Sequence, residues 1–285
     1  MSDDILSLLQ ERFRTFSKGQ KLIAGYIMDS YDKAAFMTAS KLGKTVGVSE
    51  STVVRFAVEL GFDGYPSMQK TLQALVRTKL TSVQRIEVTN SRIAGDVVGS
   101  VLQSDMDALR MTGELLDRSE MERCVEAILH AKQIYILGVR SSAAIAVYLN
   151  FHLRSVFDNV QLVSSSSTSE MFEQMIHVTR DDVVLGISLP RYSIRTVKIM
   201  QYAHDCGATT IAITDKAEAP AGRAADHVLV AKSDMVSIVD SLVAPMSVVN
   251  AMLAMISRRQ EQTLSKTYQD LERLWEEYDV TEYVE

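Results

Sequence analysis

Five short runs of consecutive apolar residues in the second half of the chain constrain its fold more than any other feature of the sequence. Helical patterns separate these runs from one another. Continuous apolar strands are typical of a parallel sheet that crossover helices bury on both faces. We therefore predict an α/β domain in which a five-stranded parallel sheet lies between two layers of helices, a three-layer αβα arrangement. The expected strands are residues 133–138, 160–163, 182–187, 209–214 and 227–231.

The beginning of the chain shows helical patterns only. Ser17 followed three residues later by Gln20 is a capping box, which marks the start of a helix. Pro66 suits the first turn of a later helix, because the amide that proline lacks would have no partner there. These signals predict an all-α domain ahead of the α/β domain, so the chain is multidomain.

Length and charge both divide the chain. Its 285 residues fit two domains of ordinary size. Residues 1–80 carry 11 Lys and Arg against 8 Asp and Glu, whereas the remaining 205 residues carry 19 against 28. A basic N-terminal part followed by an acidic remainder favours a nucleic-acid-binding module at the N-terminus, although unrelated domains also differ in charge. We predict a DNA-binding domain at residues 1–80, a linker with the start of a connecting helix at 81–104, and the α/β domain at 105–285.

Residues 39–56 have the spacing of a helix-turn-helix. Gly43 is small where two helices would cross closely, and Gly47 stands at the turn, where a positive φ is needed. Ser49 is a good N-cap for the second helix. The pattern predicts a small shared core of Leu42, Val46, Val48, Val53 and Phe56.

This geometry predicts which side chains would reach DNA. The first residues of a recognition helix contact base edges, and flanking cations neutralise phosphates. Glu50 lies in the same turn, but a carboxylate there is expected to act as a cap or a repulsive filter. The alternative is a set of ordinary capped helices in which Arg55 is a solvated surface charge. The expected DNA contacts are Ser49, Ser51, Thr52, Arg55, Lys41 and Lys44.

Three of the predicted strands are followed by loops rich in hydroxyl side chains. The first leads into Ser141 and Ser142, the second into residues 164–169, and the third into Ser188 and Ser193. Ligands of parallel sheets bind beyond the carboxyl ends of the strands, where helix N-termini favour anions. Any one of these serines could instead be a helix cap. The coincidence of three such loops predicts an anion site at this edge.

Taken together, these motifs resemble the RpiR family of regulators over roughly residues 5–260. The resemblance rests on the helix-turn-helix, on Gly61-Phe62 and Gly64-Tyr65-Pro66 beyond it, and on the serine loops. Members of that family join an N-terminal helix-turn-helix domain to a sugar isomerase (SIS) domain. The resemblance implies a dimer or tetramer that binds operator DNA and responds to phosphorylated sugars.

The predicted pocket departs from the usual SIS pattern at two glycines. Arg140 replaces the second glycine of the Gly-x-Gly-x-Ser loop, and Pro190-Arg191 replaces Ser-Gly in the loop Ser-x-Ser-Gly-x-Thr. A guanidinium can hold a phosphate or a carboxylate through paired hydrogen bonds. Alternatively, either arginine pairs with Glu170 or Asp215. The expected effector contacts are Arg140, Ser141, Ser142, Ser188, Arg191 and Ser193.

We therefore expect a DNA-binding transcriptional regulator without catalysis, whose SIS domain senses a sugar phosphate or a sugar acid. It would act as a homodimer or homotetramer, and an apolar stripe on the last helix, about residues 262–278, suits such an interface. The alternative is a sugar-phosphate isomerase with Glu173 and His177 on one helix face as catalytic candidates. A purely structural oligomerisation protein ranks last, since it leaves the hydroxyl loops without a purpose.

Several other classes are excluded by the residues that are present. Cys124 and Cys206 stand alone, without a CxxC pair or a histidine cluster, so neither a disulfide framework nor a structural zinc site is expected. No metal or other cofactor is predicted. The most apolar stretch, residues 241–256, is shorter than a membrane span and reads as a buried helix. With an acidic N-terminus instead of a secretion signal, the chain is expected to be cytoplasmic.

Overall fold

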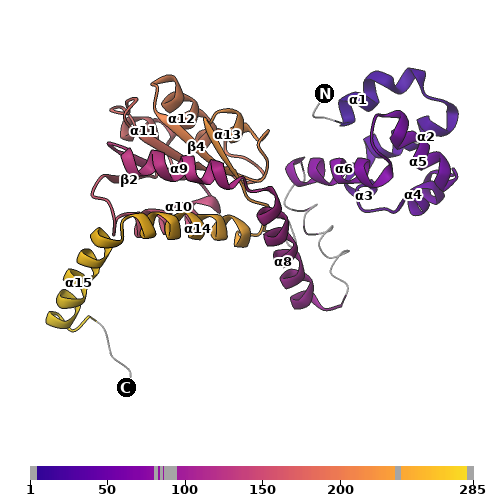
Figure 1. Cartoon of the computed structure of the whole chain (residues 1–285). Helices are drawn as coiled ribbons and strands as arrows, with labels where there is room; N and C mark the ends of the chain where they lie inside the picture. Colours follow the sequence, from indigo (N-terminus) through magenta and orange to yellow (C-terminus); the bar gives the residue numbers. More distant parts are fainter. Residues whose placement is uncertain (1–4, 80–82, 84–85, 87–94, 235–238, 281–285) are drawn as a thin grey trace. The chain divides into compact units, whose positions relative to one another are not determined.

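A computed structural model describes residues 5–79, 83, 86, 95–234 and 239–280 (Figure 1). The chain divides into two compact units: the first contains the helices before residue 80, and the second begins at Val98. Half of the predicted linker at 81–104 lies outside the described residues, and its last part belongs to a helix that begins at Val97.

The described part of the first unit is built from helices around one apolar core. Every α-helix of this unit contributes a buried side chain to the core. The short helix α3 contributes Ala34, and the other helices contribute residues such as Leu9, Ile23, Leu42, Phe56 and Leu72. The predicted capping box is present, since Gln20 Oε1 accepts a hydrogen bond from the Ser17 amide at 2.8 Å. The elements are α1 (Ile5–Arg12), a 3₁₀ turn (Phe13–Thr15), α2 (Lys18–Asp29), α3 (Tyr31–Ala34), α4 (Ala39–Val46), α5 (Glu50–Glu59) and α6 (Tyr65–Lys79).

The second unit contains a five-stranded sheet in the order β2-β1-β3-β4-β5, and every neighbouring pair is parallel. Each strand begins within one residue of its predicted run, so the predicted sheet is confirmed. The elements are α8 (Val97–Leu115), α9 (Arg118–His130), β1 (Ile134–Gly138), α10 (Ser142–Leu153), β2 (Val160–Val163), α11 (Thr168–Gln174), β3 (Val183–Ile187), α12 (Ile194–Asp205), β4 (Thr209–Thr214), α13 (Pro220–Arg223), β5 (His227–Val230), α14 (Val243–Arg259) and α15 (Glu261–Glu277).

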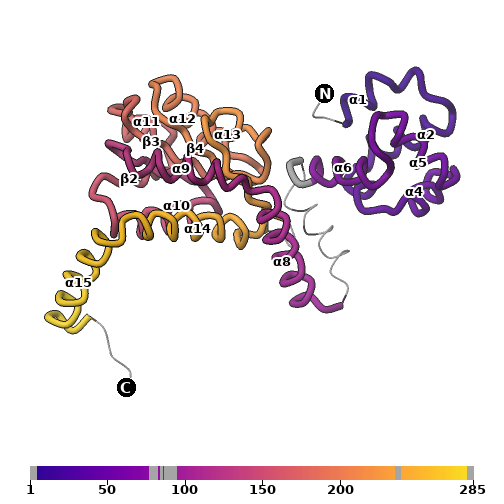
Figure 2. The backbone as a smooth tube through the Cα atoms, viewed as in Figure 1, coloured from indigo at the N-terminus to yellow at the C-terminus, as the bar shows by residue number. Residues whose placement is uncertain are grey.

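Helices cover both faces of the sheet (Figures 1 and 2). On one face, apolar side chains of α9, α10 and α14 pack on the strands, and on the other face those of α11, α12 and α13 do so. The strands are apolar on both sides because both sides are buried, and β1 and β3 are buried at every position. The three-layer αβα arrangement is therefore confirmed.

The apolar run at 241–256 forms most of α14, as predicted. Six residues of this helix are buried, among them Val248, Met252 and Ile256, which pack against the sheet. Within the part of the chain that the structure describes, no helix combines the length and the apolar character that a membrane crossing requires.

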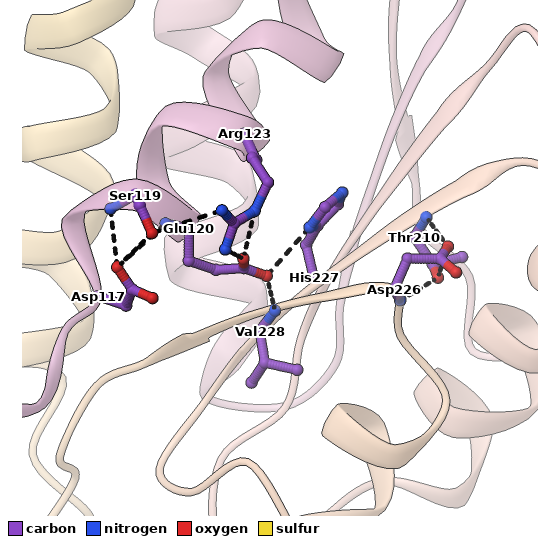
Figure 3. A network of polar contacts seen from close by, with 8 residues as sticks. All are labelled: Asp117, Ser119, Glu120, Arg123, Thr210, Asp226, His227 and Val228. Carbon is purple, nitrogen blue, oxygen red and sulfur yellow. Dashed lines mark hydrogen bonds and ion pairs between the residues drawn. The ribbon is translucent and has the colours of Figure 1, made fainter.

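Strand β5 lies at the edge of the sheet, and a carboxylate from α9 covers part of that edge (Figure 3). Glu120 Oε1 accepts hydrogen bonds from the Val228 amide at 3.1 Å and from His227 Nδ1 at 3.0 Å, while Arg123 pairs with the other oxygen. Burial by itself raises the pKa of Glu120, but these hydrogen bonds outweigh burial and lower it. The ionised form of Glu120 is therefore the form that stabilises the fold.

We expect the free energy of unfolding to fall in acid for this reason. A carboxyl whose pKa is lower in the folded chain stabilises the fold above its unfolded pKa of about 4.3, and this stabilisation is lost as the pH falls below that value. Urea unfolding of the full chain between neutral pH and about pH 3.5 should show this loss. Glu120→Gln should be less stable at neutral pH by roughly 1–2 kcal/mol and should depend less on acid.

The matched control is Glu114→Gln, because Glu114 is an exposed carboxylate on α8. It should keep the parent's pH profile. If the stability of Glu120→Gln fell in acid as much as the parent's, the assignment of this acid sensitivity to Glu120 would be contradicted.

Candidate DNA-binding and effector sites

The two helices of the predicted helix-turn-helix are α4 and α5. Gly47 ends α4 in the left-handed conformation with φ 79°, and the Val48 amide donates to the Gly43 carbonyl at 2.9 Å. Ser49 caps α5 and accepts a hydrogen bond from the Thr52 amide at 3.2 Å. A left-handed residue at the turn is inexpensive only for glycine. The predicted core is present: Leu42, Val53 and Phe56 are buried, and Val46 and Val48 pack against them.

Gly43 stands where the backbone of the turn lies against α4. A Cβ atom at this position would be 2.8 Å from the Val48 carbonyl oxygen and 3.3 Å from the Ser49 carbonyl carbon. Backbone atoms of a tight turn cannot shift as the tip of a flexible side chain can. Glycine at position 43 is therefore required by the close approach of the turn backbone to α4.

Gly43→Ala is expected to lower the free energy of unfolding of the first unit by about 1–3 kcal/mol, the usual cost of forcing extra volume into a packed contact. Gly25→Ala is the matched control, since Gly25 also lies within a helix but a Cβ there would meet nothing within 4 Å. That control should be neutral or stabilising by up to about 1 kcal/mol, because alanine favours helices. Urea unfolding of both full-length variants measures the difference, and equal stability would contradict the close contact.

The outward face of α5 carries the predicted DNA contacts. Ser49, Ser51 and Arg55 are exposed and Thr52 is half-buried. The hydroxyls form a local cluster, in which Ser49 Oγ lies 2.9 Å from Ser51 Oγ and 2.8 Å from Thr52 Oγ1. The structure thus brings the hydroxyls together at the first turn, and Arg55 follows one turn further along the helix.

The two predicted phosphate contacts come from the preceding helix. Lys41 and Lys44 both lie on α4 and both are exposed. The amide of Lys41 donates to Thr38 Oγ1 at 3.2 Å, which caps α4. Cations on the first helix and hydroxyls with an arginine on the second are the arrangement that phosphate and base-edge contacts require.

In the second unit, the candidate effector site lies at the carboxyl ends of the strands. Strand β1 pairs with β2 on one side and with β3 on the other, so the connections after β1 and β3 diverge at this point. Such a topological switch point is where open α/β sheets bind their ligands. Arg140 and Ser141 are exposed beside β1, while Ser142 is buried at the start of α10. After β3, Arg191 and Ser193 are half-buried and Ser188 is buried.

Both arginines at this edge have left-handed backbones, with φ 59° at Arg140 and φ 62° at Arg191. The usual SIS pattern has glycine at both positions. Glycine suits them because it adopts a left-handed backbone without strain. For a residue other than glycine this backbone costs about 1–2 kcal/mol. Strain of this kind is concentrated at ligand sites and switches.

Ser188 directly follows β3 and is 2% exposed. Its hydroxyl has no hydrogen-bond partner among the described residues, and the same holds for Thr214 at the end of the neighbouring strand β4. Buried polar groups in native proteins are nearly always paired. Unpaired hydroxyls at the strand ends are consistent with a site that contacts a polar ligand.

Glu170 and Asp215, the alternative partners of the arginines, have hydrogen bonds of their own. Ser165 Oγ donates to Glu170, and Tyr192 Oη donates to Asp215 Oδ1 at 2.7 Å. Tyr192 was not predicted, because nothing in the sequence places it near a carboxylate 23 residues away. The loop after β3 is thus attached to the end of β4.

The catalytic pair considered for an isomerase is not assembled as predicted. Helix α11 ends at Gln174, so Glu173 and His177 do not share a helix face, and both side chains are exposed. The prediction of one helix that contains both residues was wrong, because the chain turns after Gln174. At this turn, Gln174 Oε1 accepts a hydrogen bond from the Ser164 amide, and Gln174 Nε2 donates one to the Ser164 carbonyl.

The architecture is that of a transcriptional regulator with an N-terminal helix-turn-helix domain and a C-terminal SIS domain. Residues 3–79 match the model of the helix-turn-helix domain of the rpiR family, and residues 127–255 match that of the SIS domain. The chain belongs to the RpiR family, as its sequence motifs suggested. Relatives that span both domains are named HTH-type transcriptional regulators, which supports a regulator rather than an enzyme.

Individual relatives agree with this assignment. The sugar isomerase domain of an RpiR transcription factor from Sphaerobacter thermophilus is 30% identical, with 61% of this chain and 96% of that one covered and a TM-score of 0.58. An uncharacterized HTH-type transcriptional regulator of Haemophilus influenzae is 29% identical over 80% of each chain. Vibrio vulnificus NanR, solved as a complex with ManNAc-6P, shares the fold at 20% identity and a TM-score of 0.59, over 95% of this chain and 99% of that one.

Proposed function

We propose that the chain binds double-stranded operator DNA through α5 and that an anionic sugar derivative in the SIS domain modulates this binding. Residues 1–80 form the DNA-binding domain in this proposal, residues 81–104 connect the domains, and residues 105–285 form the effector and oligomerisation domain. Ser49, Ser51, Thr52 and Arg55 contact the major groove and its phosphates. Lys41 and Lys44 contact flanking phosphates.

The observation that carries the effector proposal is the buried hydroxyl of Ser188, which has no partner among the described residues, at the topological switch point of the sheet. Arg140, Ser141 and Ser142 lie between the end of the neighbouring strand β1 and the first residue of α10, and Arg191 and Ser193 lie in the same loop as Ser188. That NanR was solved with ManNAc-6P supports a phosphorylated sugar as the ligand.

The chemical class of the effector follows from the two arginines. Where the family's usual pattern presents glycine, whose backbone amides can approach a phosphate, this chain presents guanidinium groups. A guanidinium binds phosphate and carboxylate alike through paired, charge-assisted hydrogen bonds. The effector is therefore a sugar phosphate or a sugar acid, and a neutral sugar would lack the group that the arginines bind.

A second copy of the chain completes the proposed assembly. Helix α15 has no buried residue, although it carries an apolar stripe in which Leu274 is 43% exposed and Tyr278, just beyond its end, is 70% exposed. Phe151 on α10 is also largely exposed. An amphipathic helix is stable when its apolar face is covered. A homodimer or homotetramer formed through these helices would present two recognition helices to a two-fold symmetric operator.

The effector proposal is tested by thermal unfolding of the full chain with four probes: N-acetylmannosamine 6-phosphate, glucose 6-phosphate, gluconate and glucose. A ligand at 100 times its dissociation constant stabilises the folded chain by about 2.7 kcal/mol, which a thermal scan resolves easily. At least one anion should raise the Tm while glucose does not. A chain that responds to none of the anions, or equally to glucose, would contradict the proposal.

A further inference from the structure

A chain of hydrogen bonds leaves the candidate effector site through the loop that follows β3. Tyr192, the residue after the left-handed Arg191, donates from its phenolic oxygen to Asp215 Oδ1 at 2.7 Å. Asp215 directly follows β4 and is 7% exposed. Since a buried carboxylate is costly without hydrogen bonds, this contact fixes the position of the Tyr192 side chain.

The next contact crosses to the segment after β5. The Nζ atom of Lys232 donates to the backbone oxygen of Asp215 at 3.1 Å. The backbone amide of the same lysine donates to Thr112 Oγ1 at 2.9 Å. One residue thus joins the end of β4 to a hydroxyl on α8.

Thr112 is one of only two residues of α8 that the structure shows as buried, the other being Ala108. The remainder of the helix is exposed or half-buried. Few buried side chains therefore hold it on the domain, and the hydrogen bond of Thr112 is one of its polar contacts there. Helix α8 is also the first element of the SIS-containing unit along the chain after the DNA-binding domain.

We propose that Tyr192, Asp215, Lys232 and Thr112 couple the effector loop to α8, so that anion binding at Arg191 changes how firmly α8 is held. This inference rests on the proposed function, because it assigns a route by which the effector reaches the DNA-binding domain. The two-state element is the backbone at Arg191. A left-handed backbone is strained for a residue other than glycine, so a ligand that binds another conformation of this loop better would relieve that strain and change the position of Tyr192.

Hydrogen exchange of the full chain tests the coupling without any ligand. Tyr192→Phe removes only the phenolic oxygen, and we expect it to speed the exchange of α8 amides about tenfold. Tyr148→Phe is the matched control, because it also removes one phenolic hydrogen bond, at 2.9 Å to Asn250, but on the other face of the sheet. The α8 amides of Tyr148→Phe should exchange at the parent's rate. Unchanged exchange of α8 in Tyr192→Phe would overturn the coupling.

A second pair of variants tests the ligand response at the far end of the route. Thr112→Val removes the hydroxyl, whereas Thr112→Ser keeps it. With N-acetylmannosamine 6-phosphate, glucose 6-phosphate and gluconate as probes, any anion that binds should alter α8 exchange in the parent and in Thr112→Ser. It should not do so in Thr112→Val, whose affinity for the probe should stay within about threefold of the parent's.

The two proposals fail in different ways. A Thr112→Val variant that responds like the parent would overturn the coupling and leave the effector site intact. If no anion binds the parent, the effector proposal fails, and the result with Tyr192→Phe decides alone whether the loop and α8 are coupled.

Discussion

Replacing Arg191 by glycine is expected to weaken binding of the anionic effector by about 10- to 100-fold. A charge-assisted hydrogen bond contributes about 1.5–3 kcal/mol, and each 1.4 kcal/mol is a factor of ten in affinity. Glycine is the informative replacement because Arg191 has φ 62°. Glycine accepts this backbone without strain, so the variant should bind the ligand more weakly and keep its fold. Isothermal titration with the anion that stabilises the parent measures the loss.

Two further variants at the same edge sharpen this test. Arg191→Lys keeps the charge but loses the planar fork, so it should bind more weakly than the parent and more tightly than Arg191→Gly. Arg140→Gly relieves the similar backbone strain at position 140, where φ is 59°, and shows whether this second arginine contributes to anion binding. Urea unfolding should place all three variants within about 1–2 kcal/mol of the parent. Parental affinity in Arg191→Gly would show that this guanidinium does not hold the anion.

Arg55→Ala is expected to weaken operator binding by about 5- to 150-fold, the effect of losing one good contact worth about 1–3 kcal/mol. Arg55 is exposed on α5, so its removal should leave the stability of the first unit unchanged within about 0.5 kcal/mol. The DNA is a duplex selected by the parent protein from a random pool. Fluorescence anisotropy at fixed salt measures the affinity.

The kind of contact can be read from further variants. If Arg55 reads a base, Arg55→Ala should relax sequence preference at one position of the selected duplex. Lys41→Ala and Lys44→Ala should instead weaken binding to all duplexes and each lower the salt dependence by about one counterion. Arg258→Ala, an exposed arginine on α14 in the other unit, is the control and should bind as the parent does. Parental affinity in Arg55→Ala would exclude α5 as the reading helix in this orientation.

The sheet could be predicted from the sequence because its strands are buried on both faces. Residues such as Ile136, Leu185 and Ile213 are fully buried, and strands covered on both sides leave short continuous apolar runs in the sequence. The helix-turn-helix could be predicted for a related reason. Gly43 and Gly47 are demanded by a close backbone contact and by a positive φ, and few other residues meet those demands.

The contacts beyond the strand ends could not be predicted in the same way. Tyr192, Asp215, Lys232 and Thr112 lie far apart in the sequence, and two of their three hydrogen bonds use a backbone atom on one side. Backbone donors and acceptors are the same in nearly every residue, so they leave no pattern to detect. The end of α11 was not predicted either, and the Gln174 side chain at this end bonds to the backbone of Ser164, ten residues away.

The two left-handed arginines could be predicted only in part. The departure from glycine at Arg140 and Arg191 was visible in the sequence. Only the structure shows that both kept the backbone conformation that glycine would have taken. Both loops thus have a backbone conformation that glycine adopts easily, with a guanidinium group where the family's usual pattern has no side chain.

The most direct test of this account measures operator and effector binding on the same protein. The affinity of the full chain for its selected duplex is determined with and without the anion that raises its Tm, and the affinity for the anion with and without the duplex. The account predicts that each ligand changes the affinity for the other by one common factor, of about 5 to 150, because coupling between two sites is reciprocal. Operator affinity that is the same at saturating anion and without it would contradict a ligand-controlled regulator.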